Sequence, residues 1–314
     1  MGMNRPQLLD GRMKIRHLVL IDALASATSI AQAAERLHVT QPVVTRALQE
    51  LESVLGVSLF ERSARGVTPT IFGEAFTDHA RAMLAHLRVT ADHIAELADA
   101  GIGTVVVGTH LAGSNLLLPL AIERLKRGRP KVTVIVHEAN PEALAAELLS
   151  GGLDLIVGRL TTLDDAQRLR QEALYSEPVR LVARAGHPAS AASADSAGLA
   201  GLMDYPWVLP VAETALRREL EAAFLREGLP LPADRVECTS ILTTRHLLLN
   251  SDSIAALPEL ITHGEPGLCH LPIHLRSVSS SVGITEAAGR ASSPATRTLA
   301  DCLRAVAADL RPAR

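Results

Sequence analysis

The sequence predicts an α+β chain of more than one domain, with a helical N-terminal part followed by a larger α/β part. Apolar residues recur every three or four positions as far as Ala98, which is the period of amphipathic helices. Gly101 and Gly103 interrupt that period, and β-branched runs then alternate with helical segments, as in α/β domains. The length of 314 residues also exceeds the ~150 residues of an average single domain.

The composition is that of a globular protein. Apolar residues make up 47% and charged residues 21% of the chain, which excludes a disordered or fibrous protein. No apolar run reaches the ~18–20 residues that span a bilayer, and residues 1–14 lack the apolar core of a signal peptide, so we expect a cytoplasmic protein. Cys238, Cys269 and Cys302 are far apart and form no CxxC pair, as is typical of a reducing compartment.

The net charge of −3, taken alone, argues against a polyanionic partner. The charge is unevenly distributed, however. Residues 1–70 carry eight basic and six acidic side chains, residues 71–102 two and five, and residues 103–314 twenty-one and twenty-three. Only the first segment is positive, and a solvated face with scattered charge also explains that small excess.

Three short helices are predicted at the N-terminus. The first covers residues 15–28, and its apolar face carries Leu18, Ile21 and Ala25. Ser29 begins the second helix and forms an S-x-x-Q capping box with Gln32, in which each side chain accepts from the other's backbone amide. The buried stripe of this second helix consists of Ile30, Ala33, Ala34 and Leu37.

The third helix follows a two-residue connection. Thr40 is its predicted cap, Pro42 lies in its first turn and Gly56 ends it. Its buried face consists of Val44, Leu48, Leu51 and Leu55. Its outward face carries Gln41, Thr45, Gln49 and Glu52, with Arg46 beside them.

That outward face is suited to DNA binding, because Gln and Arg form bidentate hydrogen bonds with adenine and guanine edges in the major groove. Two short helices joined by a tight turn, the second with Gln41 and Arg46 near its start, form a helix-turn-helix pattern. The alternative is an ordinary three-helix core with a solvated outer face.

Residues 57–69 predict a small hairpin, a wing, with Arg65 at its tip. An arginine there is suited to a narrow minor groove, although a turn arginine in solvent is the alternative. Thr70 then caps a helix that runs to about Ala98 and is roughly 45 Å long. Its apolar positions are Phe72, Phe76, Met83, Leu87, Ile94 and Ala98. Such a helix needs a partner surface, either a second copy of the chain or its own domain.

Beyond residue 103 the alternation of strands and helices predicts a parallel sheet that is covered on both faces. The predicted strands are 104–108, 132–136, 153–158, 179–183, 207–209, 236–239, 253–257 and 282–285. The predicted helices are 116–126, 141–149, 214–227, 243–250 and a last one after Pro294. The Ala/Ser-rich residues 189–201 predict a surface loop.

The chain resembles the LysR-type transcriptional regulators. The matching residues in the N-terminal part are Ser29, 33–37, 40–46, 51–52, 55–57, 59–62, 65–67, Thr70 and Gly73. A looser match covers 117–119, 152–155, 187–188 and 254–258, so the resemblance spans nearly the whole chain. Within the family, residues 13–18 and 157–160 are similar to the branch of the galactose-binding-protein regulator and the protocatechuate-operon regulator.

The resemblance implies three parts. Residues 13–70 would form a winged helix-turn-helix DNA-binding domain, 71–102 a linker and dimerisation helix, and 103–314 an effector-binding domain of the periplasmic-binding-protein type. Subdomain I of the latter would hold about 103–177 and 281–314, and subdomain II about 178–280, with crossings near Glu177 and 277–281. The family pattern implies a homodimer or homotetramer on operator DNA, a small-molecule inducer, no cofactor, and RNA polymerase as a further candidate partner.

The resemblance also implies site residues, residue by residue. Those expected at the major groove are Thr40, Gln41, Thr45 and Arg46, with Arg65 in the minor groove and Ser29 and Gln32 at phosphates. Thr45 replaces a commoner serine and keeps the hydroxyl. Those expected at the effector are Thr109, His110, Ser114, Asn115, Arg159, Thr214, Thr239 and Ser240. Arg159 would pair with a carboxylate or bind a sugar hydroxyl; for each hydroxyl residue, a helix cap or turn is the alternative.

The implied function is a ligand-responsive, sequence-specific regulator of sugar uptake or catabolic genes, with a sugar or an aromatic or other carboxylic acid as effector. An enzyme is the second hypothesis, but the sequence has no nucleophile elbow, HExxH or P-loop. The spacing of His263, Cys269, His270 and His274 matches no known metal site. A transport-type binding protein, the third hypothesis, lacks a DNA-binding head.

Overall fold

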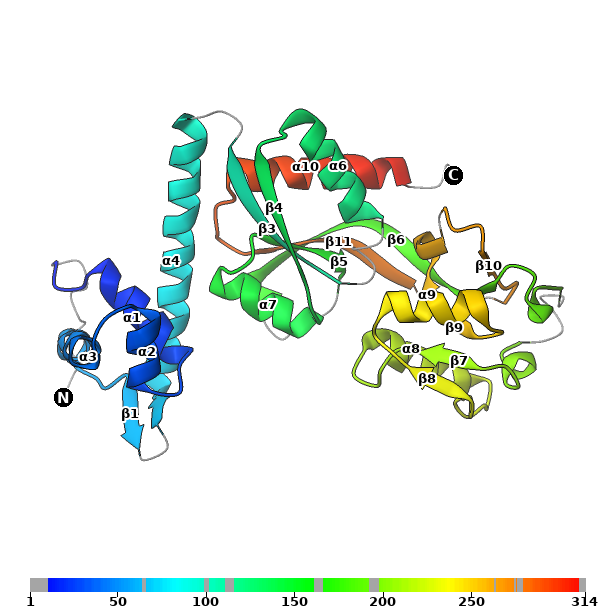
Figure 1. Cartoon of the computed structure of the whole chain (residues 1–314), viewed down its shortest axis with the longest axis horizontal. Helices are drawn as coiled ribbons and strands as arrows, with labels where there is room; N and C mark the ends of the chain where they lie inside the picture. Colours follow the sequence, from blue (N-terminus) through cyan, green and yellow to red (C-terminus); the bar gives the residue numbers. More distant parts are fainter. Residues whose placement is uncertain are drawn as a thin grey trace.

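The computed structural model describes residues 11–63, 66–98, 102–110, 116–160, 166–191, 198–262, 264–273, 275 and 279–310. Figure 1 shows a small N-terminal head, one long helix, α4, and a larger module of two lobes. The head contains α1 (Ile15–Ala25), α2 (Ile30–Arg36), α3 (Gln41–Leu55), β1 (Phe60–Ser63) and β2 (Gly66–Pro69). No helix in the described ranges is both long and apolar enough to cross a membrane.

The core of the head confirms the predicted apolar faces. Leu18 and Ile21 of α1 pack with Ala33 of α2 and with Val44 and Leu48 of α3, and all five are buried. Burying apolar surface stabilises a fold by ~25 cal/mol per Å² removed from water. This shared core therefore stabilises three helices that are too short to be stable alone.

The capping pattern between α1 and α2 differs from the prediction. α1 ends at Ala25, three residues early. The Ser29 hydroxyl accepts from the Gln32 amide N–H at 3.2 Å, as expected, but the Gln32 Oε1 accepts from the N–H of Thr28 at 2.8 Å and not from Ser29. The expected reciprocal box is therefore wrong by one residue, because Thr28 no longer belongs to a helix and its amide needs a partner. Thr40 is the N-cap of α3, yet its side chain makes no cap hydrogen bond.

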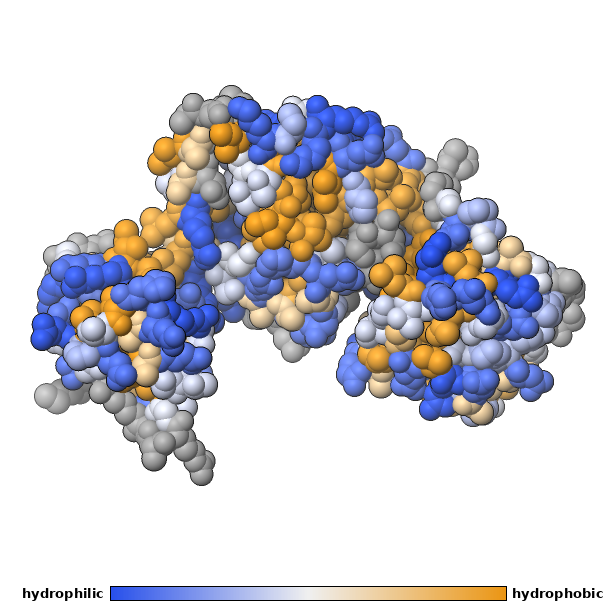
Figure 2. Space-filling view, in the orientation of Figure 1, coloured by the Kyte–Doolittle hydropathy of each residue, from blue (hydrophilic) through white to orange (hydrophobic). Residues whose placement is uncertain are grey.

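The long helix α4 (Ile71–Ala98) has 28 residues and is about 42 Å long. Thr70 caps it as predicted: its Oγ1 accepts from the Gly73 N–H at 3.1 Å and donates to the Ser58 carbonyl at 2.8 Å. α4 packs on α1 near its start and on α7 further along. Phe72, Met83, Leu87 and Ile94 remain exposed on it, and Figure 2 shows hydrophobic surface along its upper part.

The two-lobed module is built on one nine-stranded sheet in the described residues, with strand order β4-β3-β5-β11-β6-β9-β7-β8 and β10 paired to β6. The strands are β3 (Gly103–Thr109), β4 (Val132–Glu138), β5 (Leu155–Arg159), β6 (Leu169–Arg184), β7 (Trp207–Leu209), β8 (Arg235–Glu237), β9 (Ile254–Pro258), β10 (Leu268–His270) and β11 (Ser279–Ala287). The helices are α6 (Leu117–Gly128), α7 (Pro141–Ser150), α8 (Ala215–Arg226), α9 (Ile241–Asn250) and α10 (Pro294–Leu310), with short 3₁₀ turns at 166–168, 188–191, 200–202 and 259–262.

The prediction of an all-parallel sheet is wrong. β3, β4 and β5 are parallel to one another, as are β7, β8 and β9, but β6 and β11 are antiparallel to their neighbours. The reason is that β6 and β11 run in opposite directions between the lobes (Figure 1). β6 also begins ten residues before the predicted strand, and β10 was not expected. Residues 192–197 of the predicted surface loop lie outside the described residues.

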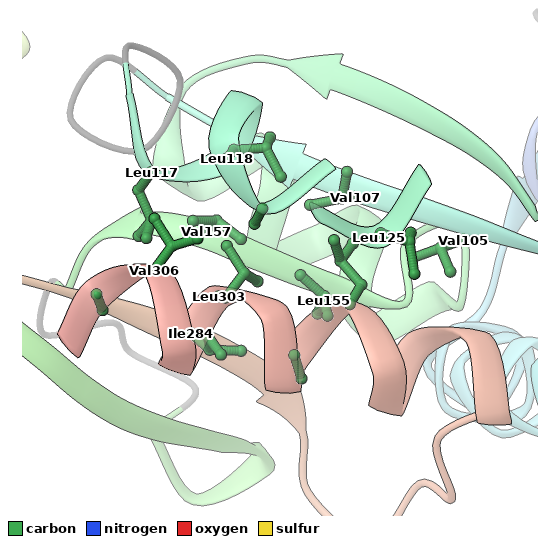
Figure 3. Close-up of a cluster of buried hydrophobic side chains, with 14 of the residues drawn as sticks. Val105, Val107, Leu117, Leu118, Leu125, Leu155, Val157, Ile284, Leu303 and Val306 are labelled. Carbon is green, nitrogen blue, oxygen red and sulfur yellow. The ribbon is translucent and has the colours of Figure 1, made fainter. Parts of the chain in front are cut away.

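We define the first lobe as β3–β5 with α6, α7 and α10, and the second lobe as β7–β10 with α8 and α9. In the first lobe, Leu303 and Val306 of α10 point toward Val157 and Ile284 of the sheet (Figure 3). In the second lobe, Trp207 packs edge-on against Phe224 of α8, with ring centroids 5.3 Å apart. Each lobe therefore has its own core, and the region where β6 and β11 pass between the cores is called the junction below.

Candidate functional site

The exposed start of α3 is the first candidate surface. The side chains of Thr40, Gln41 and Arg46 are exposed and that of Thr45 is half-buried. Within the described part of the chain, no hydrogen bond involves the side chains of Gln41 or Arg46. Their amide and guanidinium groups are thus available for an external partner, in the types and spacing that suit base edges.

The start of α2 lies beside this surface. Because the Ser29 hydroxyl acts as an acceptor in the cap, its hydrogen can still be donated outward, and the NH₂ group of Gln32 is likewise unused by the bonds that its Oε1 makes. Helix N-termini with such donors bind phosphates. Arg65, the predicted wing contact, lies outside the described residues.

Glu52 behaves differently from the expectation that it points outward. It is half-buried, and its Oε1 accepts from the N–H of Leu59 at 2.6 Å and from that of Phe60 at 3.3 Å. These bonds tie the last turn of α3 to the first strand of the wing. Glu52 therefore links two elements of the head, and its sequence position on the outward side of the helix concealed that role.

The predicted effector residues that follow β3 and β5 lie in the first lobe. Thr109 is buried, and its hydroxyl donates to the Val157 carbonyl at 2.9 Å, so its hydrogen is used within the sheet. His110 packs over Gly158, where an added Cβ would lie 2.6 Å from the His110 Nε2. Burial lowers the pKa of His110, so the imidazole is neutral at pH 7. Ser114 and Asn115 lie outside the described residues.

The predicted effector hydroxyls of the second lobe lie at helix starts. Thr214 caps α8: it accepts from the Arg217 N–H at 3.2 Å and donates to the Val211 carbonyl at 2.9 Å. Ser240 caps α9 by accepting from the Thr243 N–H at 3.3 Å, and Thr239 before it is exposed. Thr214 and Ser240 therefore act as helix caps in this structure, which is the alternative role predicted above for hydroxyl residues.

Arg159 connects the lobes. It stands at the end of β5, its guanidinium is largely buried, and Nη2 donates to the Glu219 Oε1 on α8 of the second lobe. The second oxygen of Glu219, Oε2, is buried and has no hydrogen-bond partner among the described residues. Sequence reasoning selected Arg159 but missed Glu219, which is sixty positions away.

Two further unpaired groups lie on β6 at the junction. Four buried side-chain polar atoms lack a partner in the described ranges, and three belong to Tyr175, Glu177 and Glu219. Tyr175 shares a face of the sheet with Arg159, since both pair with Val282 of β11. Burial raises the pKa of Glu177 to about 7, so the protonated and the ionised carboxyl coexist at neutral pH. Burial also raises the pKa of Tyr175, so its hydroxyl keeps its proton there. Buried polar groups without partners are uncommon, and they gather here.

The sequence cluster of His263, Cys269, His270 and His274 lies only partly within the described residues. Cys269 and His270 lie on β10, and the Nε2 of His270 is 2.7 Å from the Thr262 hydroxyl. Burial raises the pKa of the Cys269 thiol, which opposes the thiolate form that binds metals. His263 and His274 lie outside the described residues.

Comparison with known proteins identifies the family. Residues 15–74 match the sequence model "Bacterial regulatory helix-turn-helix protein, lysR family", and residues 98–308 match the "LysR substrate binding domain". The transcriptional regulator PcaQ of Agrobacterium fabrum is 33% identical over 96% of this chain and 98% of its own length. GbpR of Azospirillum brasilense is 32% identical over 95% and 87%.

Solved structures agree with this match. A full-length OxyR variant from Pseudomonas aeruginosa is 27% identical with a TM-score of 0.66, covering 93% of this chain and 98% of its own. The LysR family regulator CbnR, at 23% identity, shares the fold with a TM-score of 0.61 over 94% and 99%. With both sequence models matched and relatives aligned over almost their whole length, the chain belongs to the LysR family of bacterial transcriptional regulators.

Proposed function

We propose that the protein recognises operator DNA through the start of α3 and responds to a small metabolite bound at the junction. The observation that carries the proposal is the pair of exposed side chains, Gln41 and Arg46, which have no internal hydrogen bonds in the described structure. In this proposal Thr40, Gln41, Thr45 and Arg46 meet base edges, Ser29 and Gln32 meet phosphates, and Arg65 enters the minor groove.

The division of labour follows the proposed domains. We assign DNA binding to 13–70, dimerisation to 71–102 and effector binding to 103–314, with subdomain I at 103–177 and 281–314 and subdomain II at 178–280. The family matches over 15–74 and 98–308 support these limits. The paired strands β6 and β11, which run between the lobes, support the two-subdomain division.

A second copy of the chain is the proposed partner of α4. Phe72 is 49% and Ile94 63% exposed, and Met83 and Leu87 lie exposed between them. Apolar positions along so long a helix are stabilised when a second helix covers them. Two heads on one dimer also suit a two-fold operator, which compensates for the small positive charge of each head. CbnR, a structural neighbour, has been solved in complex with its target DNA.

The effector candidates are Thr109, His110, Ser114, Asn115, Arg159, Thr214, Thr239 and Ser240. Arg159 is the strongest of them, because it is largely buried and reaches the other lobe. The curated relatives are named as transcriptional regulators, which supports a cytoplasmic protein that acts on transcription and catalyses no reaction.

A gel shift with DNA from upstream of the protein's own gene tests the DNA-binding half. Gln41→Ala and Arg46→Ala should each weaken operator binding by about 5- to 150-fold, because a bidentate base contact is worth ~1–3 kcal/mol. Ser53→Ala, an exposed change near the other end of α3, is the matched control and should bind normally. Thermal melts verify that all three variants are folded, and wild-type footprints from both Gln41 and Arg46 variants would disprove the assignment.

A further inference from the structure

The ion pair between Arg159 and Glu219 spans the junction from one lobe to the other. Arg159 comes from the end of β5, and Glu219 from the middle of α8. Their side chains are 17% and 30% exposed, so both are largely withdrawn from water. Glu219 thus already occupies the place on Arg159 where an anionic ligand would bind.

The remaining unpaired polar groups at the junction include both hydrogen-bond acceptors and donors. Glu219 Oε2 and Glu177 Oε2 are buried without a partner in the described residues, and so is the Tyr175 hydroxyl. Glu177 Oε1 accepts from the Leu260 N–H at 3.0 Å, which leaves its other oxygen for something else. In addition, Glu142 places negative charge near His110. A ligand that satisfies this set must offer both donors and acceptors, as hydroxyl groups do.

A carboxylate ligand fits these groups poorly. It brings acceptors only, and to reach Arg159 it must displace Glu219, which would then have two buried oxygens without a partner. Breaking a buried ion pair in this way is unfavourable. A hydroxyl group, in contrast, accepts from the Arg159 guanidinium and donates to a Glu219 oxygen at the same time, so the ion pair persists.

We propose, building on the effector role proposed above, that the junction takes an uncharged polyhydroxylated ligand of the monosaccharide type, whose hydroxyls bridge Arg159 and Glu219. Neighbouring ring hydroxyls would meet the Tyr175 hydroxyl and the Glu177 carboxyl, which are the other unpaired groups. Because the two bridging residues belong to different lobes, the ligand binds both lobes at once.

Titration calorimetry on the full-length chain tests this ligand class. The neutral probes are D-galactose, D-glucose and L-arabinose, and the acidic probes are benzoate and 3,4-dihydroxybenzoate. We expect at least one neutral sugar to bind and neither acid to do so. Binding of an acid without any of the sugars overturns the proposal, and so does a panel in which no sugar binds.

Glu219→Gln distinguishes the two chemistries by the sign of its effect. A bridging sugar loses its charged acceptor, so its affinity should fall more than tenfold; an acid loses its competitor for Arg159, so its affinity should rise. Glu221→Gln is the matched control, because Glu221 lies on the same helix but pairs with Arg217 inside the second lobe at 2.8 Å. That variant should bind the sugar within twofold of the wild type.

Sugar binding that Glu219→Gln leaves unchanged overturns the assignment to this ion pair. If that variant does not fold, Glu219→Asp replaces it: the charge is kept but drawn back by one methylene, with the same expected signs. A parallel gel shift on the wild-type chain separates the two proposals. If the wild-type chain binds a sugar but no operator DNA, only the proposed regulator mechanism is refuted. If it binds operator DNA but takes acids and no sugar, only the proposed ligand class is refuted.

Discussion

The carboxylate of Glu52 accepts a hydrogen bond from the backbone N–H of Leu59 at 2.6 Å and a longer one from Phe60. This side chain therefore links α3 to the first strand of the wing. In the proposed DNA complex this link matters, because α3 and the wing would enter neighbouring grooves and must keep a constant angle.

Glu52→Ala should lower the free energy of unfolding of the head by about 1–3 kcal/mol, since it leaves the Leu59 amide without its acceptor. Urea titration of the full chain, followed by circular dichroism, measures this change. Ser53→Ala, the exposed neighbour, serves as the control. A difference below about 0.5 kcal/mol between the two variants would show that water replaces the carboxylate without cost.

His38, which follows the C-cap of α2, adopts a left-handed backbone conformation with φ of 52°. Because a Cβ is disfavoured in that region, His38→Gly should raise the free energy of unfolding by roughly 0.5–1 kcal/mol. His38→Val should lower it, since a β-branched side chain fits this conformation worse than histidine does. Thermal melts of both variants check the prediction, and equal melting temperatures would refute it.

Gly73, in the first turn of α4, leaves no room for a side chain. An added Cβ would lie 2.0 Å from the Leu59 carbonyl oxygen. Gly73→Ala should therefore destabilise the head by about 1–3 kcal/mol through forced backbone shifts. Gly128→Ala, at the end of α6 with nothing within 4 Å, should be neutral or stabilising, and comparable losses in both variants would contradict the steric explanation.

The pKa of Glu177 is raised by burial to about 7 from an ordinary 4.5. The folded state thus binds a proton that the unfolded state releases, so stability should fall as pH rises from about 4.5 to about 7, by at most about 3 kcal/mol. The groups that face it are the Tyr175 hydroxyl, the Glu259 carboxylate and the Leu260 N–H. The free energy of unfolding, measured by urea titration at several pH values between 5 and 8, should fall less steeply with pH in Glu177→Gln than in the wild type. An unchanged pH dependence would show that another group titrates.

The sequence predicts the position of a helix well where the helix buries a single apolar face. Val44, Leu48 and Leu51 are all buried on one side of α3, and the bounds of α4 and β7 agree with the sequence closely. Local periodicity is sufficient there because the helix or strand has a single face toward one core.

The start of β6 was missed because its side chains are charged. Arg170 pairs with Glu286 of β11, and Glu172 pairs with Arg304 of α10 at 2.8 Å, so partners far along the chain stabilise a strand with no apolar pattern. The same distance in sequence concealed Glu219 from prediction. Single residues such as Arg159 can be selected by type and place, but the partner that decides their chemistry appears only when the lobes come together.

The position of β6 and β11 also has a consequence for biosynthesis. The second lobe is inserted between these strands, and the core of the first lobe is closed by α10, which ends at Leu310. The head and α4 are complete at Ala98, and at ~5–20 residues per second the ribosome adds α10 roughly 10–40 s later. During that interval β5 lacks its neighbouring strand β11, and α10 does not yet cover the apolar side chains of β3 and β5. The nascent chain therefore presents a folded DNA-binding head together with an unfinished sheet, which is the kind of surface that chaperones bind.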